Sequence, residues 1–163
     1  MTVPLPDPMN LMTTPPSRQC AQDVALFELL IRKIFHSGFS RDVVDRRWNA
    51  FQKAFQGFNP AIVAEYTDSD VCGLLNRSDL IRNRRKMFAA VRNARQVQRL
   101  ILQHGSFQAW LESLSSAPFE QRVDTLVACF EQMGINTAFW FLLEAGYATL
   151  DEYPDVYEFP TDA

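Results

Sequence analysis

Apolar side chains recur every three or four residues along most of this chain, and glycines close several of these runs. The first run contains Val24, Phe27, Ile31 and Ile34, and it ends at Gly38. This spacing is the period of an α-helix that buries one face, and glycine is common just beyond a helix end. The alternation typical of strands and hairpins is not found. The pattern therefore predicts an all-α protein.

The residues at which these runs begin and end predict seven or eight helices in one compact domain. The expected spans are Cys20 to Gly38, Ser40 to Gly57, Ala61–Tyr66, Asp68 to Leu75 with Asp68 as its cap, about Asn83 to His104, Ser106 to Leu114, Pro118–Met133 and Thr137–Gly146.

The two ends of the chain differ in composition from the middle. Residues 1–19 hold five of the nine prolines, which predicts an extended N-terminal arm. Residues 148–163 carry acidic and no basic side chains, together with two prolines, which predicts an irregular acidic tail. The helical domain is therefore expected at residues 20–147.

The composition excludes several classes of protein. A hydrophobic fraction of 47% is enough for a packed core, which excludes a largely disordered protein. No apolar run approaches the roughly 20 residues of a membrane span, and the N-terminus lacks a signal-peptide pattern, so a cytoplasmic protein is expected. The three cysteines (Cys20, Cys72 and Cys129) are widely separated. They indicate neither a disulfide framework nor a zinc site, and no metal or cofactor is expected; buried thiols are the simpler interpretation.

The net charge of −3 hides a strong asymmetry along the chain. Residues 32–99 hold 14 basic and 6 acidic groups, a balance of +8, whereas residues 100–163 balance to −9. No acidic residue occurs between Leu80 and Leu111. Such a segment favours an anionic partner, although pairing with the acidic C-terminal part of the same chain is the alternative.

Three stretches resemble the DNA-3-methyladenine glycosylase I family, a branch near the helix-hairpin-helix glycosylases. Ala-Leu-Phe-Glu-Leu-Leu at 25–30 precedes Phe-His-Ser-Gly-Phe-Ser at 35–40. Phe-Gln-Gly-Phe-Asn-Pro at 55–60 leads to Leu-Ile-Arg-Asn-Arg-Arg-Lys-Met at 80–87. A weaker match is Met-Gly-Ile-Asn-Thr at 133–137. The resemblance covers about residues 22–147.

The resemblance implies a helix-hairpin-helix glycosylase fold and excision of alkylated bases from DNA by hydrolysis of the N-glycosidic bond. The chain departs from the family at two pocket positions. The family's catalytic glutamate falls at Lys33, and its pocket tryptophan falls at Arg41. The zinc-binding residues of the longer members are absent, so the resemblance is to short, zinc-less members.

The resemblance places the base pocket around the end of the first helix. Two residues there are candidates for catalysis: His36 would act on a base or a water, and Lys33 would act as an amine nucleophile. The other candidates would line the substrate pocket, where aromatic rings stack on an extruded base. They are Glu28, Arg41, Trp48, Thr137 and Trp140. For the aromatic residues, core packing is the alternative.

The connection at 76–79 and the helix after it would contact the DNA backbone. The basic candidates are Arg77, Arg82, Arg84, Arg85, Lys86 and Arg92. Asp79 stands where a hairpin of this kind normally has glycine, and its carboxylate would repel a phosphate.

Three functions are therefore open. The first is a monomeric DNA glycosylase of base excision repair, with DNA as its partner and no membrane. The second is an inactive descendant that still binds DNA. The third is an interaction protein or small-molecule enzyme on the same fold.

Overall fold

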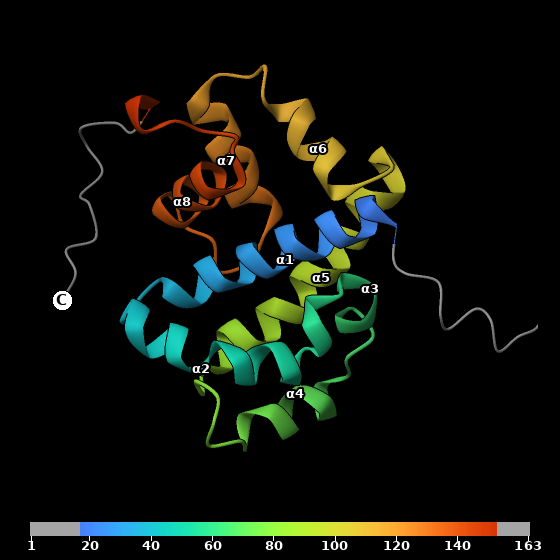
Figure 1. Cartoon of the computed structure of the whole chain (residues 1–163), viewed down its shortest axis with the longest axis vertical. Helices are drawn as coiled ribbons and strands as arrows, with labels where there is room; N and C mark the ends of the chain where they lie inside the picture. Colours follow the sequence, from blue (N-terminus) through green and yellow to red (C-terminus); the bar gives the residue numbers. More distant parts are fainter. Residues whose placement is uncertain (1–16, 153–163) are drawn as a thin grey trace, which may run out of the picture.

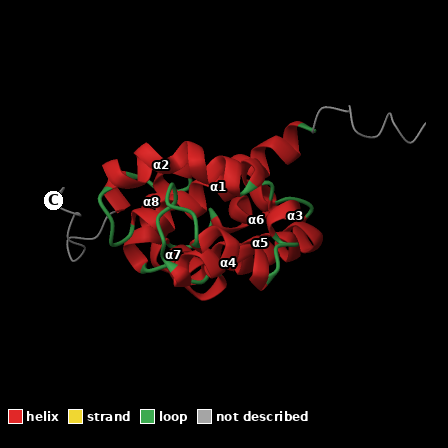
Figure 2. Ribbon diagram, turned by 90° about the horizontal axis from the view of Figure 1, so that it is seen from below, coloured by secondary structure: helices red, strands yellow, loops and turns green. Residues whose placement is uncertain are grey.

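The computed structural model describes residues 17–152. Within this range the chain forms eight α-helices and two short 3₁₀ helices, and it contains no strand (Figure 2). The α-helices are α1 (Arg18–His36), α2 (Arg41–Ala54), α3 (Pro60–Val63), α4 (Asp68–Leu75), α5 (Arg84–His104), α6 (Phe107–Leu114), α7 (Phe119–Cys129) and α8 (Ile135–Ala145); the 3₁₀ helices are η2 (Gln56–Phe58) and η3 (Leu150–Glu152). The all-α prediction is confirmed.

Helix α1 crosses the middle of the molecule, with α6, α7 and α8 on one side and α2, α3 and α4 on the other (Figure 1). It packs on both groups and on α5. The reason is its composition: Phe27, Leu30, Ile31 and Phe35 are completely buried. Burial of such side chains is the main favourable term in folding. The C-terminal end of α1 therefore lies where the two groups of helices meet.

Aromatic rings fill the core between α1, α2 and η2. Trp48 stacks on Phe51 with ring centroids 5.3 Å apart and on Phe58 at 5.1 Å. Phe35 meets Phe51 edge to face at 4.8 Å. These ring contacts have preferred geometries beyond simple burial, and they join α2 and η2 to α1.

Several predicted boundaries were wrong because side-chain hydrogen bonds decide where a helix starts or stops. Thr67, not Asp68, caps α4: its hydroxyl accepts from the Asp70 N–H, and the Asp70 carboxylate accepts from the Thr67 N–H. The helix expected at Pro118–Met133 ends at Cys129. There, the buried Asn93 side chain bonds both the N–H and the C=O of Glu131.

Smaller differences occur in short segments. The helix expected at Ala61–Tyr66 is Pro60–Val63, and the first helix begins at Arg18 rather than near Cys20. The start of the acidic tail forms η3 and docks on α7, where Glu152 pairs with the buried Arg122. Cys20 and Cys72 are exposed, which contradicts the expectation of buried thiols. The Pro-rich arm up to residue 16 and the tail from residue 153 lie outside the described residues.

Candidate functional site

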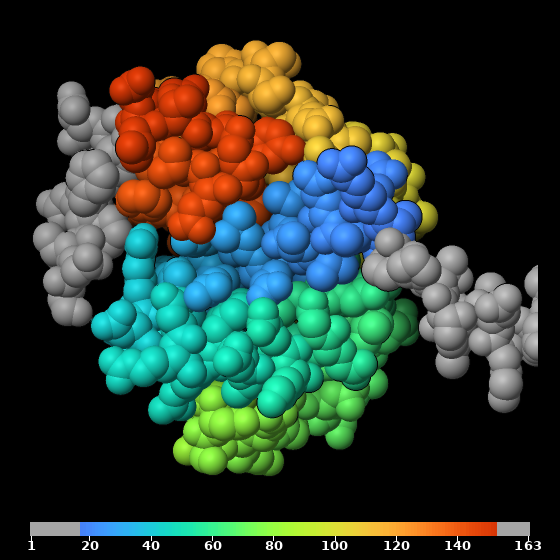
Figure 3. Space-filling view, viewed as in Figure 1, coloured from blue at the N-terminus to red at the C-terminus, as the bar shows by residue number. Residues whose placement is uncertain are grey.

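The C-terminal end of α1 carries a buried lysine that pairs with a carboxylate from the last helix. Lys33 is 5% exposed, and its ammonium donates a hydrogen bond to Oε1 of Glu144 in α8. A buried charge requires such a partner. Figure 3 shows α8 meeting α1 and the start of α2 on this face of the molecule.

His36 lies one turn beyond Lys33 and is held by α2. Its Nε2 atom is 2.9 Å from Oδ1 of Asp45, which also accepts hydrogen bonds from Arg32 at 2.7 and 3.1 Å. Burial lowers the pKa of His36 below its ordinary value, and this effect outweighs the hydrogen bond to Asp45. The histidine is therefore biased towards its neutral form, which is the form able to accept a proton.

Arg41, at the start of α2, and Trp140, in α8, face each other near the C-terminal end of α1. The Arg41 guanidinium lies 5.4 Å from the Trp140 ring centroid, which is a cation–π distance. Trp140 also meets the ring of Phe139 edge to face. Two residues predicted from distant parts of the sequence thus come together at the end of α1.

Lys86, in the first turn of α5, reaches the turn between α1 and α2. Its Nζ donates to the backbone carbonyl of Ser37 and lies 4.8 Å from the Phe39 ring. Burial lowers the pKa of Lys86 to about 8. Gly38 in this turn has a φ of +80°, a conformation that favours glycine. Lys86 therefore contacts the predicted pocket rather than the outer face of α5.

Three of the predicted pocket residues have packing roles in the structure. The Glu28 carboxylate accepts hydrogen bonds of 2.7 Å from Trp48 Nε1 and from Gln52, which joins α1 to α2. Trp48 is 3% exposed and belongs to the aromatic core. Thr137 is buried in the first turn of α8. The structure brings Lys33, His36, Arg41 and Trp140 together, whereas Glu28 and Trp48 lie in the packing of α1 against α2.

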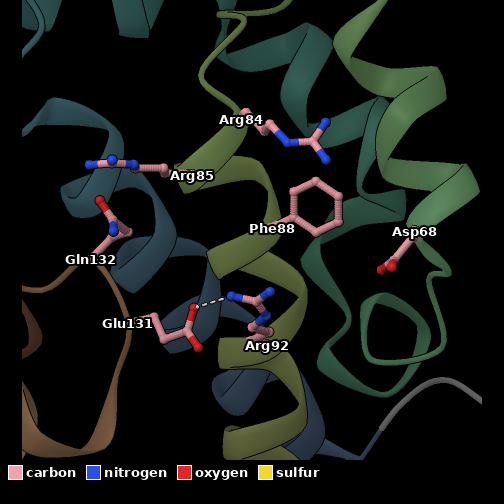
Figure 4. A pocket seen from close by; sticks show the side chains of 7 residues that line it. All are labelled: Asp68, Arg84, Arg85, Phe88, Arg92, Glu131 and Gln132. Atoms are coloured by element: carbon pink, nitrogen blue, oxygen red, sulfur yellow. Dashed lines mark hydrogen bonds and ion pairs between the residues drawn. The ribbon is translucent and has the colours of Figure 1, made fainter.

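An open groove of about 550 Å³ lies along the outer face of α5. Arg84, Phe88 and Arg92 follow one another down the helix, and both guanidinium groups lie within 5.9 Å of the Phe88 ring centroid (Figure 4). The other lining residues are Asp68, Arg85, Glu131 and Gln132. The groove thus combines three arginines with an aromatic surface, which suits a nucleic acid backbone.

The basic side chains of α5 are only partly free to bind an anion. Arg92 pairs with Glu131 at 3.0 Å. This contact agrees with the alternative that the basic segment pairs with the acidic C-terminal part of the same chain. Arg95 donates to the carbonyls of Ala64 and Tyr66. Arg84 and Arg85 are exposed and form no ion pair within residues 17–152. These two arginines are therefore the available cations of the groove.

The connection between α4 and α5 has its own ion pair. The Arg77 guanidinium contacts both carboxylate oxygens of Asp79, at 2.9 and 2.6 Å. This contact holds the pKa of Asp79 below its usual range. Arg47 of α2 donates to the carbonyls of Ser78 and Leu80. The Asp79 carboxylate is thus neutralised locally, which reduces the repulsion expected for a phosphate, while Arg82 remains exposed.

The described residues place no three His, Cys, Asp or Glu side chains together as a metal ion would need. In the same part of the chain, no helix is both long and apolar enough to cross a membrane.

Comparison with known proteins identifies the family. The model of the methyladenine glycosylase family matches residues 17–138, about three quarters of the chain. The chain belongs to the methyladenine glycosylase family. The matched region contains Lys33, His36, Arg41 and the whole of α5.

Solved structures with the same fold include other methyladenine glycosylases. One is a variant of 3-methyladenine DNA glycosylase I in complex with 3-methyladenine, with a TM-score of 0.70, 24% identity and 88% of each chain covered. Another is the 3-methyladenine DNA glycosylase I of Staphylococcus aureus, with a TM-score of 0.68 and 24% identity over 88% of this chain and 87% of the other. At this level of identity the likeness establishes the fold.

Two residues of the site are not apparent from the sequence. Asp45 orients His36, and Glu144 pairs with Lys33. In the sequence, Glu144 belongs to the acidic C-terminal part and has no motif around it. One signal pointed towards it: Lys33 follows the apolar face of α1, and a lysine at a buried position requires a counter-charge.

Proposed function

We propose that this protein removes alkylated bases from DNA by hydrolysing the N-glycosidic bond. The supporting observation is the cluster at the end of α1, where a carboxylate (Glu144), a histidine whose pKa is lowered by burial (His36) and an aromatic ring (Trp140) meet beside the basic start of α5. Membership of the methyladenine glycosylase family supports the same reaction class. The proposal includes action as a monomer in the cytoplasm, with DNA as the partner.

The chemistry requires an extruded nucleotide and little acid catalysis. An enzyme that acts on a base must take it out of the stack and hold it against aromatic or apolar surface, which Trp140 would supply. A base alkylated on its ring nitrogen carries a positive charge. When the bond to C1′ breaks, the electron pair stays on that base and it leaves as a neutral molecule. Water then adds to C1′ and releases one proton.

DNA would lie against the start of α5. Arg84 and Arg85 are the exposed cations of the groove that form no ion pair within residues 17–152, and Arg82 lies at the end of the preceding connection. Each phosphate contact raises the dependence of the affinity on salt by about 0.9 in the slope of log K against log salt. Contacts of this kind position the duplex and carry no sequence information, as a repair enzyme requires.

The decisive experiment measures release of 3-methyladenine from methylated DNA by the purified protein, together with DNA affinity at several salt concentrations. We expect release of the base and a salt-dependent affinity. The double variant Arg84→Gln/Arg85→Gln should bind DNA more weakly and with a slope lower by about 1 to 2. Lys53→Gln, on the exposed end of α2, is the matched control for loss of a positive charge.

The alternatives correspond to other outcomes. Lys33 stands where the family resemblance implies a glutamate, and this favours an inactive DNA-binding descendant as the second candidate. DNA affinity without any base release would support that descendant and overturn the proposed reaction. Absence of DNA affinity as well would indicate a different partner for the arginine groove.

A further inference from the structure

The ion pair between Lys33 and Glu144 presents its carboxylate, and not its amine, to the surroundings. The Lys33 side chain is 5% exposed, whereas that of Glu144 is 42% exposed. Lys33 donates to Oε1 of Glu144, and within residues 17–152 the Oε2 atom accepts no hydrogen bond. The accessible functional group at this point of the site is therefore a carboxylate oxygen.

The second carboxylate of the cluster is more heavily engaged. One oxygen of Asp45 accepts two hydrogen bonds from Arg32 and contacts Nε2 of His36. Breaking these contacts would release both a guanidinium and the ring of His36. Within residues 17–152, Glu144 has Lys33 as its one ion-pair partner, whereas Asp45, which is equally exposed (44% against 42%), shares its charge between Arg32 and His36. Glu144 is therefore the less neutralised of the two carboxylates.

We propose that Glu144 is a catalytic carboxylate of the base-excision reaction and that Lys33 is the positioning residue that holds it. This assignment rests on the proposed function. As the glycosidic bond breaks and its electrons leave with the base, positive charge develops on the sugar at C1′. A carboxylate stabilises such an oxocarbenium-like state, as paired carboxylates do in glycoside hydrolysis. The same group accepts the proton of the water that adds to C1′ and then passes it to solvent.

The surrounding cations explain why Lys33 is needed in this role. Arg41 lies over the Trp140 ring, and Lys86 donates to the Ser37 carbonyl, so neither of these cations pairs with Glu144 in the structure. Lys33 comes from the central helix and is almost completely buried, so it gives Glu144 a fixed anchor. An exposed glutamate without such an anchor would sample several rotamers, and orientation contributes strongly to catalysis.

The test compares Glu144→Gln with Glu120→Gln, an exposed glutamate of α7, in single-turnover base release and in DNA binding. We expect Glu144→Gln to lower the single-turnover rate by about 100-fold or more with unchanged DNA affinity. Glu120→Gln should remain within about twofold of wild type, the range of a surface substitution away from the site.

Loss of the Glu144 charge alone leaves a buried ammonium without a counter-charge, and this can unfold the protein. The double variant Lys33→Met/Glu144→Gln removes both charges and should fold, while its rate should fall as far as that of Glu144→Gln. Lys33→Met alone should lower kcat more than it changes KM, and Lys33→Arg should restore part of the rate. A lysine with a purely structural role would give neither the larger effect on kcat than on KM nor the recovery of rate in Lys33→Arg.

The outcomes separate this assignment from the proposed function. A wild-type protein that releases base, together with a folded double variant that releases it at the same rate, overturns the role of Glu144 and leaves the proposed function intact. A wild-type protein that releases no base overturns both.

Discussion

The Nε2 atom of His36 lies 2.9 Å from Oδ1 of Asp45, and the Nδ1 atom on the other side of the ring is buried and has no hydrogen-bond partner among residues 17–152. Although burial raises the pKa of Asp45, hydrogen bonds from Arg32 and His36 hold it below its ordinary value. An ionised Asp45 places the ring proton on Nε2. The neutral ring therefore keeps its lone pair on Nδ1.

Replacing Asp45 with asparagine should lower the pKa of His36 further. Burial already disfavours the imidazolium, and the hydrogen bond that His36 donates to Asp45 is the main effect that opposes burial. NMR titration of the ring resonances measures the change. The chain contains two histidines, so His104 at the end of α5 serves as the internal reference. A pKa of His36 that stays the same or rises in Asp45→Asn would contradict this account.

Lys86 should make the protein more stable as the pH rises through the alkaline range. Its pKa is about 8 in the folded state against an ordinary value of 10.5, so the unfolded chain holds more protons between these values. The free energy of unfolding therefore increases with pH in this window. Urea denaturation at several pH values should show this rise in wild type and in the exposed control Lys53→Met. The rise should be missing in Lys86→Met.

Glu28→Ala should lower the free energy of unfolding because Glu28 has a packing role, whether or not it contacts DNA. The substitution leaves the buried indole N–H of Trp48 without its acceptor. An unsatisfied buried donor costs about 1–3 kcal/mol. The free energy of unfolding from urea denaturation measures the effect. Glu65→Ala, at an exposed position, should change it by less than about 0.5 kcal/mol.

The cap of α4 can be checked with two adjacent substitutions. Thr67→Ala removes the hydroxyl that accepts from the Asp70 N–H and should cost about 1 kcal/mol of unfolding free energy. Asp68→Ala removes the residue that the sequence pattern suggested as the cap, and it should cost less. The reverse order in thermal or urea denaturation would show that Asp68 is the cap after all.

Arg122→Met should release η3 from α7. The buried guanidinium donates to the carbonyls of Ala117 and Tyr147 and pairs with Glu152. Hydrogen exchange should accelerate at the amides of Thr149 and Glu152, both of which are hydrogen-bonded within this segment. Arg46→Met, an exposed position on α2, should leave the exchange of both amides unchanged.

The helices were predictable because their apolar spacing is a local property of the chain. Long helices such as α1 and α5 were found with their ends within one or two residues, since Gly38 lies two residues beyond the end of α1 and Gly105 directly follows α5. The end of α7 was missed because Asn93, 38 residues away, holds the backbone of Glu131 out of the helix. A side chain that acts over such a separation leaves no trace in a local pattern.

The candidate site could be predicted only at positions that belong to, or lie beside, a family motif. The resemblance brought together Lys33, His36, Arg41 and Trp140, which the structure places at one junction. It also included Trp48, which packs in the core, because aromatic residues at helical spacing look alike in a sequence whether buried or not. Glu144 was counted only as part of an acidic segment, since its partner depends on how α8 packs against α1.

The same packing has a consequence for synthesis of the chain on the ribosome. Lys33 emerges early, but Glu144 is translated 111 residues later. Until α8 leaves the exit tunnel, the nascent chain holds the lysine that α1 later buries with no counter-charge from the last helix. Burial of that lysine is therefore opposed during translation, and completion of the fold is delayed until nearly the whole domain has been made.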